Sequence, residues 1–138
     1  MSKIFHKLYY HVVWRTKKNQ PLITPEIEKV LYPFLVNKSK RFDCIIHAIG
    51  GVENHIHLAI SIQPSESTSD IIGKLKGSSA YFLNKELQIT EHFSWQNGFG
   101  ILTFAERDLP KIIHYINNQK EHHRLNTLNQ IMETMGDN

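Results

Sequence analysis

Alternation of apolar and polar residues is the first pattern along the chain, and it predicts four β-strands. Residues 7–16 (KLYYHVVWRT) are rich in β-branched and aromatic side chains, and 43–50 and 55–62 follow as two further stretches of this kind. Four residues (GVEN) separate those two stretches, a length that suits a hairpin connection. The fourth strand is predicted within 93–104, where glycines interrupt the apolar residues.

Apolar residues at helical spacing predict three helices between and after these strands. The first begins at Thr24, a good N-cap before a proline, and Pro33 is expected to kink or shorten it. The second spans about residues 70–87. The third runs from 108 past 123 and leaves 126–138 as a weakly helical, polar tail.

The order of these elements predicts the fold. Strand, helix, strand, strand, helix and strand follow one another, which is the ferredoxin-like βαββαβ arrangement. We therefore expect an α+β, RRM-like fold with one antiparallel sheet, two helices on one face and an extra C-terminal helix for the open face. With 138 residues and no internal repeat, the chain is expected to form one domain over 1–138.

Composition and charge limit the classes of function. Apolar residues make up 41% and charged residues 21%, a globular balance that argues against disorder. No apolar run approaches the ~18 residues of a membrane span and no signal peptide is evident, so we expect a cytoplasmic protein with no membrane partner. Cys44 is the single cysteine, which excludes an internal disulfide and a cysteine-based zinc site. An excess of 16 basic over 13 acidic residues permits a nucleic-acid partner.

Two histidines on the third predicted strand could hold a metal. In 55–62 the alternation is strict, with four isoleucine or leucine residues on one face and His55 and His57 on the other. Two imidazoles two residues apart on a strand project side by side and can share a divalent ion. The same pattern is also consistent with a half-exposed strand that carries two polar histidines.

The last predicted helix carries a tyrosine that could act as a nucleophile. Tyr115 lies at the edge of the apolar stripe, and Gln119, one turn later, shares its face together with His122. His123 falls nearer the apolar stripe, where a packing role is expected. Tyr115 as nucleophile with Gln119 as an oxygen ligand is one interpretation, and a tyrosine packed at the boundary of an amphipathic helix is the other.

Two groups of residues could contact a phosphate backbone, one on the second helix and one after the first strand. A solvated helix face and a charged turn explain the same residues equally well. The candidate DNA-binding residues are Lys74, Lys76, Gly77, Arg15, Lys17 and Lys18.

The motifs taken in order resemble those of a known family. HIH at 55–57, KLKGSS at 74–79, WQNGFG at 95–100 and YINNQ at 115–119 are similar to the single-tyrosine HUH transposases, and the resemblance covers 11–123. These enzymes serve prokaryotic insertion sequences that move as single-stranded DNA. The resemblance implies a ferredoxin-like fold, a homodimer, and the activity of a metal-dependent nickase and strand transferase. It also implies that the protein is associated with the nucleoid when it is bound to DNA.

Carried over residue by residue, the resemblance makes His55 and His57 metal ligands, Gln119 the third ligand and Tyr115 the nucleophile. It implies Mg²⁺ or Mn²⁺ as cofactor, single-stranded DNA with hairpins as partner, and a 5′-phosphotyrosine intermediate. It also favours shared active sites, in which the tyrosine helix covers the partner's sheet. The sequence alone leaves open whether this helix acts within its own chain.

Three other functions remain open at this point. A domesticated relative would apply the same chemistry to chromosomal palindromic repeats. A non-catalytic ferredoxin-like nucleic-acid-binding module would need stacking aromatics on its central strands, where this chain has His55 and His57. A small zinc hydrolase would leave Tyr115 without a role.

If Gln119 is not the third ligand, Glu53 and His122 are the next candidates.

Overall fold

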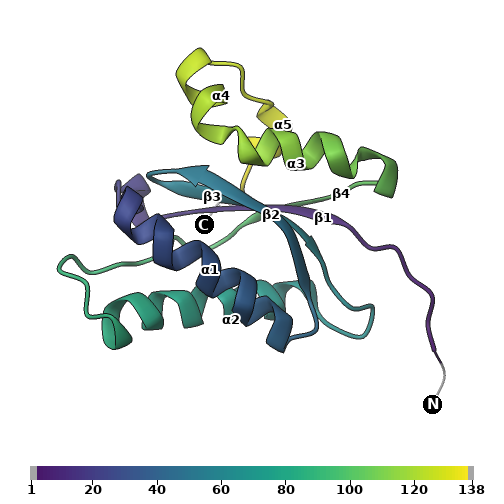
Figure 1. Ribbon diagram of the computed structural model, residues 1–138, viewed down its shortest axis with the longest axis horizontal. Helices are drawn as coiled ribbons and strands as arrows, with labels where there is room; N and C mark the ends of the chain where they lie inside the picture. The colour runs from purple at the N-terminus through teal and green to yellow at the C-terminus, as the bar shows by residue number, and fades with distance from the viewer. Residues whose placement is uncertain (1–2, 137–138) are drawn as a thin grey trace.

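A four-stranded antiparallel sheet forms the middle layer of the computed structural model, which describes residues 3–136 (Figure 1). The strand order β2-β3-β1-β4 is that of a ferredoxin-like fold, so the predicted α+β class is confirmed. The strands are β1 (Tyr10–Arg15), β2 (Ile45–Val52), β3 (His55–Ser61) and β4 (Gly100–Thr103).

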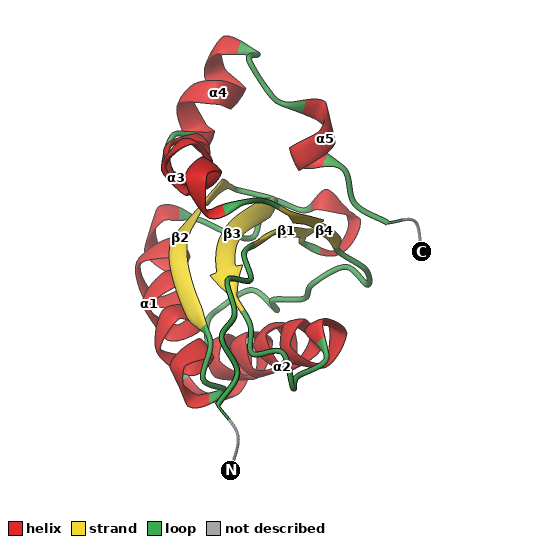
Figure 2. Cartoon of the chain, turned by 90° about the vertical axis from the view of Figure 1, so that its right-hand side faces the viewer, coloured by secondary structure: helices red, strands yellow, loops and turns green. Residues whose placement is uncertain are grey.

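Two long helices, α1 (Pro25–Arg41) and α2 (Thr68–Tyr81), cover one face of the sheet (Figure 2). Thr24 caps α1 as predicted, accepting a hydrogen bond from the Ile27 amide at 3.2 Å. Pro33, expected to kink or shorten this helix, does not shorten it, because α1 continues through it to Arg41. The helix is held on both sides of the proline by Leu31 and Leu35, which are fully buried against the sheet.

The main core lies between these helices and the sheet. Every second residue of β1 and β3 points into this core, as the alternation of the sequence predicted. Fully buried members from these two strands are Val12, Trp14, Ile56, Leu58 and Ile60.

The opposite face of the sheet is covered by the C-terminal part of the chain, shown at the top of Figure 1. The helix expected from 108 past 123 is broken at Asn118, because the Asn118 side-chain amide donates to the His114 carbonyl oxygen at 2.7 Å and competes with the helical pattern. The polar tail contains one further helical turn. The resulting helices are α3 (Leu109–Asn117), α4 (Gln119–Leu125) and α5 (Gln130–Glu133).

Two other predicted elements are less regular than expected. The strand expected within 93–104 is regular only in its last part, β4. Before it, Trp95 forms an isolated bridge with Thr16. The second helix ends as α2 at Tyr81 and continues as a π-helical turn, η2 (Phe82–Glu86). Within residues 3–136, no helix has the length and apolar character needed to cross a membrane.

The backbone of α3 lies directly on β2 at a glycine. A Cβ atom at Gly50 would be 2.2 Å from the Ile116 carbonyl oxygen, so no side chain fits there. Ile116 itself is fully buried in a small apolar cluster with Ala48 and Ala59, separate from the main core. Small residues on the sheet therefore set how closely the helix that carries Tyr115 approaches it.

We expect Gly50→Ala to lower the free energy of unfolding by about 1–3 kcal/mol, because the new methyl group forces α3 away from the sheet. Gly73→Ala is the matched control: a Cβ at this position in α2 has nothing within 4 Å, so a gain of about 0.4–1 kcal/mol is expected. Urea unfolding of both variants measures the difference. Equal effects at the two positions would show that α3 does not depend on this close approach.

Candidate active site

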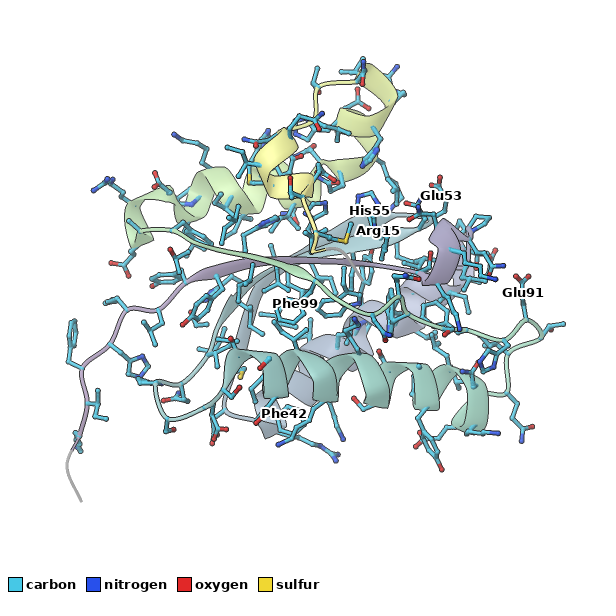
Figure 3. The ribbon with its side chains drawn as sticks, turned by 180° about the vertical axis from the view of Figure 1, so that it is seen from behind. Arg15, Phe42, Glu53, His55, Glu91 and Phe99 are labelled. Atoms are coloured by element: carbon cyan, nitrogen blue, oxygen red, sulfur yellow. The ribbon has the colours of Figure 1, made fainter. Side chains whose placement is uncertain are left out.

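The histidine pair of β3 is buried on the sheet face opposite the main core, as the alternation predicted. His57 is fully buried and His55 is 8% exposed, because α3, α4 and α5 cover this face. Figure 3 shows His55 beside Arg15 on the side of the sheet that faces α5. The alternative of a half-exposed strand with two solvated histidines is therefore wrong.

Hydrogen bonds orient both imidazole rings. The Asn54 side-chain oxygen accepts from His55 Nδ1 at 2.8 Å, which leaves the lone pair of His55 Nε2 directed into the site. His57 Nδ1 lies 2.8 Å from Nε2 of His11, a buried residue of β1. Burial lowers the pKa of His57, and burial together with His57 lowers the pKa of His11 to about 4, so both rings are neutral near pH 7. If the proton between these two rings is assigned to His57 Nδ1, the Nε2 atom of His57 keeps a lone pair that a metal ion could use.

A carboxylate from the end of the chain meets these two nitrogens. Glu133 Oε1, in α5, lies 3.1 Å from His55 Nε2 and 3.1 Å from His57 Nε2. Burial by itself would raise the pKa of Glu133, but its contacts with His55 and His57 hold it below the usual range, so the carboxyl is ionised. The Nε2 atoms of His55 and His57 and the Glu133 oxygen all lie within 4.8 Å of one another, and imidazole nitrogen and carboxylate oxygen are ligand types that a divalent ion accepts. The residues present therefore fit a divalent metal.

Tyr115 lies at the same point. Its hydroxyl donates a hydrogen bond to Glu133 Oε2 and accepts one from the Asn129 amide at 3.0 Å. Its ring is 6.0 Å from the His57 ring, centre to centre. Burial and the contact with Glu133 raise the pKa of Tyr115 to about 12, so the phenol is protonated at neutral pH. In one chain, the tyrosine thus reaches its own histidine pair.

Three other side chains near the tyrosine differ in their roles. Gln119 is 1% exposed, and neither atom of its amide has a hydrogen-bond partner within residues 3–136. Its role as third ligand stays a prediction. His122 donates to or accepts from Thr127 Oγ1 and packs its ring 4.7 Å from that of Tyr115. His123 packs its ring 4.9 Å from that of His55, centre to centre, and its Nε2 lies 3.2 Å from His55 Nε2, so it has the hydrogen-bonded packing position expected for it.

Sequence reasoning missed Glu133. It lies 76 residues after His57, in a polar tail whose pattern predicted no definite contact. Asn129 caps the short helix α5 by accepting from the Ile131 and Met132 amides, and this cap is the one local signal that the tail is structured.

The two basic groups lie in different places. Lys74, Lys76 and Gly77 belong to α2, on the sheet face away from the histidines. The Lys74 ammonium lies 5.4 Å from the centre of the Phe42 ring. Figure 3 shows Phe42 on this side of the sheet, away from His55. Lys76 is partly buried and donates to the carbonyl oxygens of Gln96 at 2.7 Å and Gly98 at 2.9 Å. Its ammonium is therefore engaged within the fold.

The second basic group lies next to the site. Arg15 is paired with His55 across β1 and β3, and its Nε contacts Met135 Sδ at 3.3 Å. Lys17 and Lys18 follow in the 3₁₀ turn η1 (Lys17–Asn19). A pocket of about 260 Å³ opens here, lined by Arg15, Lys18, Asn19, Gln96, Asn97, Met135 and Gly136.

A ferredoxin-like sheet with a buried histidine pair and a tyrosine on its open face defines the class of single-tyrosine transposases. The family model described as "Transposase IS200 like" matches residues 4–119, and the chain belongs to this family. The resemblance stated from the motifs is confirmed.

Individual relatives agree with this assignment. The ISDra2 transposase TnpA of Deinococcus radiodurans is 25% identical over 121 residues, which cover 84% of this chain and 86% of the relative. A crystal structure of a candidate transposase from Deinococcus radiodurans R1 has a TM-score of 0.65 at 25% identity, covering 86% of this chain and 98% of that one. A REP-associated tyrosine transposase, solved bound to a REP hairpin, has a TM-score of 0.64 at 12% identity, covering 89% and 74%, and shares the fold.

A stability measurement can distinguish the structural roles of the two lysines of α2. We expect Lys76→Met to lower the free energy of unfolding by about 1–3 kcal/mol, because it removes two hydrogen bonds from a charged donor. Lys74→Met, on the exposed side of the same helix, should cost less than about 1 kcal/mol. Urea unfolding of both variants gives the comparison. Equal stability of the two would mean that Lys76 does not hold residues 96–98.

Proposed function

We propose that residues 1–138 act as one HUH nuclease domain, a metal-dependent transposase for single-stranded DNA. The enzyme nicks and rejoins DNA at hairpin-marked element ends through a 5′-phosphotyrosine intermediate. The observation that carries this proposal is the convergence of the Tyr115 hydroxyl with the His55–His57 pair around one carboxylate. Membership of the IS200-like transposase family supports the reaction class.

The chemistry is an exchange of one phosphoester for another. The Tyr115 oxygen attacks phosphorus, a tyrosine O–P bond forms, and the bond from phosphorus to the 3′-oxygen breaks. The phenolic proton passes from Tyr115 to Glu133 Oε2, to which the hydroxyl donates, and the departing oxygen takes up a proton from water to become a free 3′-OH. Because the phosphotyrosine keeps the energy of the ester, a second 3′-OH can reverse the step and join a new strand without ATP.

The chain's own residues position this exchange. His55 and His57 would hold Mg²⁺ or Mn²⁺, and Glu133 supplies an oxygen in contact with both. Gln119 is the further ligand that the family resemblance implies. When bound, the metal polarises the scissile phosphate and stabilises charge on the leaving oxygen. The Asn129 amide, which donates to the Tyr115 oxygen, stabilises that oxygen as it loses its proton.

Hairpin DNA is the proposed partner, and the prokaryotic cytoplasm, at the nucleoid, is the proposed place of action. A protein that shares this fold was solved with a hairpin, which supports the choice of ligand. Arg15, Lys17 and Lys18 border the site and would contact the strand that is cut. Lys74 and Gly77, exposed on α2, would contact DNA on the other face, with Lys76 ordering the loop beside them.

We expect Tyr115→Phe to form no covalent protein–DNA adduct, because it lacks the attacking oxygen. The assay uses 3′-labelled single strands copied from the DNA that flanks the gene, with denaturing electrophoresis of the products. Tyr81→Phe is the matched control, since Tyr81 is 60% exposed on α2, and it should form adduct like wild type. Adduct formation by Tyr115→Phe would remove Tyr115 from its role.

The same assay tests the metal and the substrate. EDTA and His57→Ala should each abolish the adduct, added Mn²⁺ or Mg²⁺ should restore it only in the wild type, and a full duplex should not react. Undiminished adduct in EDTA would refute the metal assignment while leaving the tyrosine in place.

We further propose a homodimer with shared sites. The C-terminal part of the chain docks on the sheet through the small Ala48, Ala59 and Ile116 cluster rather than through the main core. Exchange of this part between two copies would keep each contact of the site and require little new surface. The family resemblance favours this exchange, although one chain alone brings its own Tyr115 to His57.

Complementation decides between the two arrangements. His57→Ala and Tyr115→Phe chains are each inactive alone, and with shared sites a mixed dimer has one site with both lesions and one with none. After random 1:1 exchange, half of the dimers are mixed, so about a quarter of all sites should be intact. Adduct yield after co-refolding measures this fraction. Background yield, with mixed dimers confirmed by mass, would mean that each site is built within one chain.

A further inference from the structure

The pocket beside Arg15 is polar and small. Its volume is about 260 Å³, below the roughly 300–1,000 Å³ of sites for drug-sized ligands, so it has room for one smaller group. Arg15 forms part of its wall and lies directly opposite His55 in the pairing of β1 with β3 (Figure 3). The pocket therefore adjoins the candidate active site without sharing its histidines.

Side-chain amides dominate the lining of this pocket. Asn19, Gln96 and Asn97 each contribute one. Within residues 3–136, the only hydrogen bond to these amides is the one that Gln96 Oε1 accepts from the Lys18 backbone N–H at 3.2 Å. The other amide groups are free to donate and accept. Arg15 and Lys18 add two positive charges, and no carboxylate among the described residues lines the pocket.

Hydrogen bonds hold both walls of the pocket in place. The Gln96 N–H donates to the Arg15 carbonyl oxygen at 2.9 Å, and the Lys76 ammonium donates to the Gln96 carbonyl oxygen at 2.7 Å from the other side. Lys18 and Asn19 have left-handed backbone conformations, with φ of 57° and 56°, which residues other than glycine keep where their surroundings fix them. The pocket is thus formed before a ligand binds.

We propose that this pocket takes one unpaired nucleobase of the strand that is cut, next to the scissile phosphate. The inference rests on the proposed function, which places that phosphate at the histidine pair. Because Arg15 lies directly opposite His55, the pocket is within reach of the neighbouring nucleotide. A single strand suits such a site, since its bases are unpaired and can turn out of the stack.

The two kinds of side chain make different contacts. Arginine and lysine bind phosphates whatever the sequence, so Arg15 and Lys18 hold the backbone of the strand. Asparagine and glutamine amides can form two hydrogen bonds with one base edge, which makes Asn19 and Asn97 determinants of the base that is accepted. A good pair of this kind changes the relative affinity for two bases about 5- to 150-fold.

The test removes a base and leaves its phosphate. Single strands copied from the DNA that flanks the gene carry one abasic site, at each position in turn, and the rate of adduct formation by the full chain is measured. At one position beside the cut, the abasic site should lower the wild-type rate about 5- to 150-fold. Asn97→Ala and Asn19→Gly should lose most of the response at this position. Glycine keeps the left-handed backbone of Asn19.

Two further variants distinguish a base contact from other effects. Lys18→Gln should weaken binding to intact and abasic strands alike and reduce its salt dependence, because Lys18 contacts phosphate. Asn37→Ala is the matched control, since Asn37 is exposed on α1 and lies on the other face of the sheet, and it should behave like wild type. Thermal melting shows whether each variant folds.

Fluorescence anisotropy of the same strands in EDTA repeats the comparison without cleavage. An abasic response in Asn97→Ala and Asn19→Gly that equals the wild-type response at every position would overturn the base pocket and leave the proposed transposase intact. If the wild type forms no adduct but binds with a base dependence that both variants lose, the proposed reaction fails and the pocket stands. Loss of both adduct and base dependence in the wild type would overturn both.

Discussion

The strict alternation along β3 is the constraint on which the rest of the structure depends. Its neighbours β1 and β2 pair with it on both sides, and both of its faces are buried. Isoleucine and leucine residues therefore face the main core while His55 and His57 face the C-terminal helices. A slip of one residue would place imidazoles in the core and isoleucines at the site, so the register is fixed by burial on both faces.

Burying polar groups on the second face requires partners for each of them. The Nδ1 atom of His55 is hydrogen-bonded to Asn54, and the Nδ1 atom of His57 is hydrogen-bonded to His11. Glu133 faces the Nε2 atoms of both histidines. The same carboxylate reaches the Tyr115 hydroxyl through its other oxygen. One residue from a four-residue helix thus connects the candidate metal ligands with the candidate nucleophile, which makes this short helix part of the site rather than a loose end.

The position of the tyrosine depends on how closely α3 can lie on the sheet. Gly50 allows the backbone contact, and Ala48 and Ala59 supply a shallow apolar surface for Ile116. Because that cluster is small, docking of this part of the chain rests on the polar contacts of the site as well as on apolar burial. The residues of the candidate site therefore also help to hold the C-terminal helices on the sheet. The main core, in contrast, packs without them.

The sequence by itself determined the order of strands and helices, the two faces of β3, the Thr24 cap and the histidine and tyrosine motifs, because these follow from local periodicity and residue type. Only the tertiary structure decided that His123 turns toward His55 and that Lys76 donates to the carbonyl oxygens of Gln96 and Gly98. It also brought Glu133 to the pair. These contacts join residues up to 78 positions apart, and no local pattern encodes which distant polar groups share a buried space.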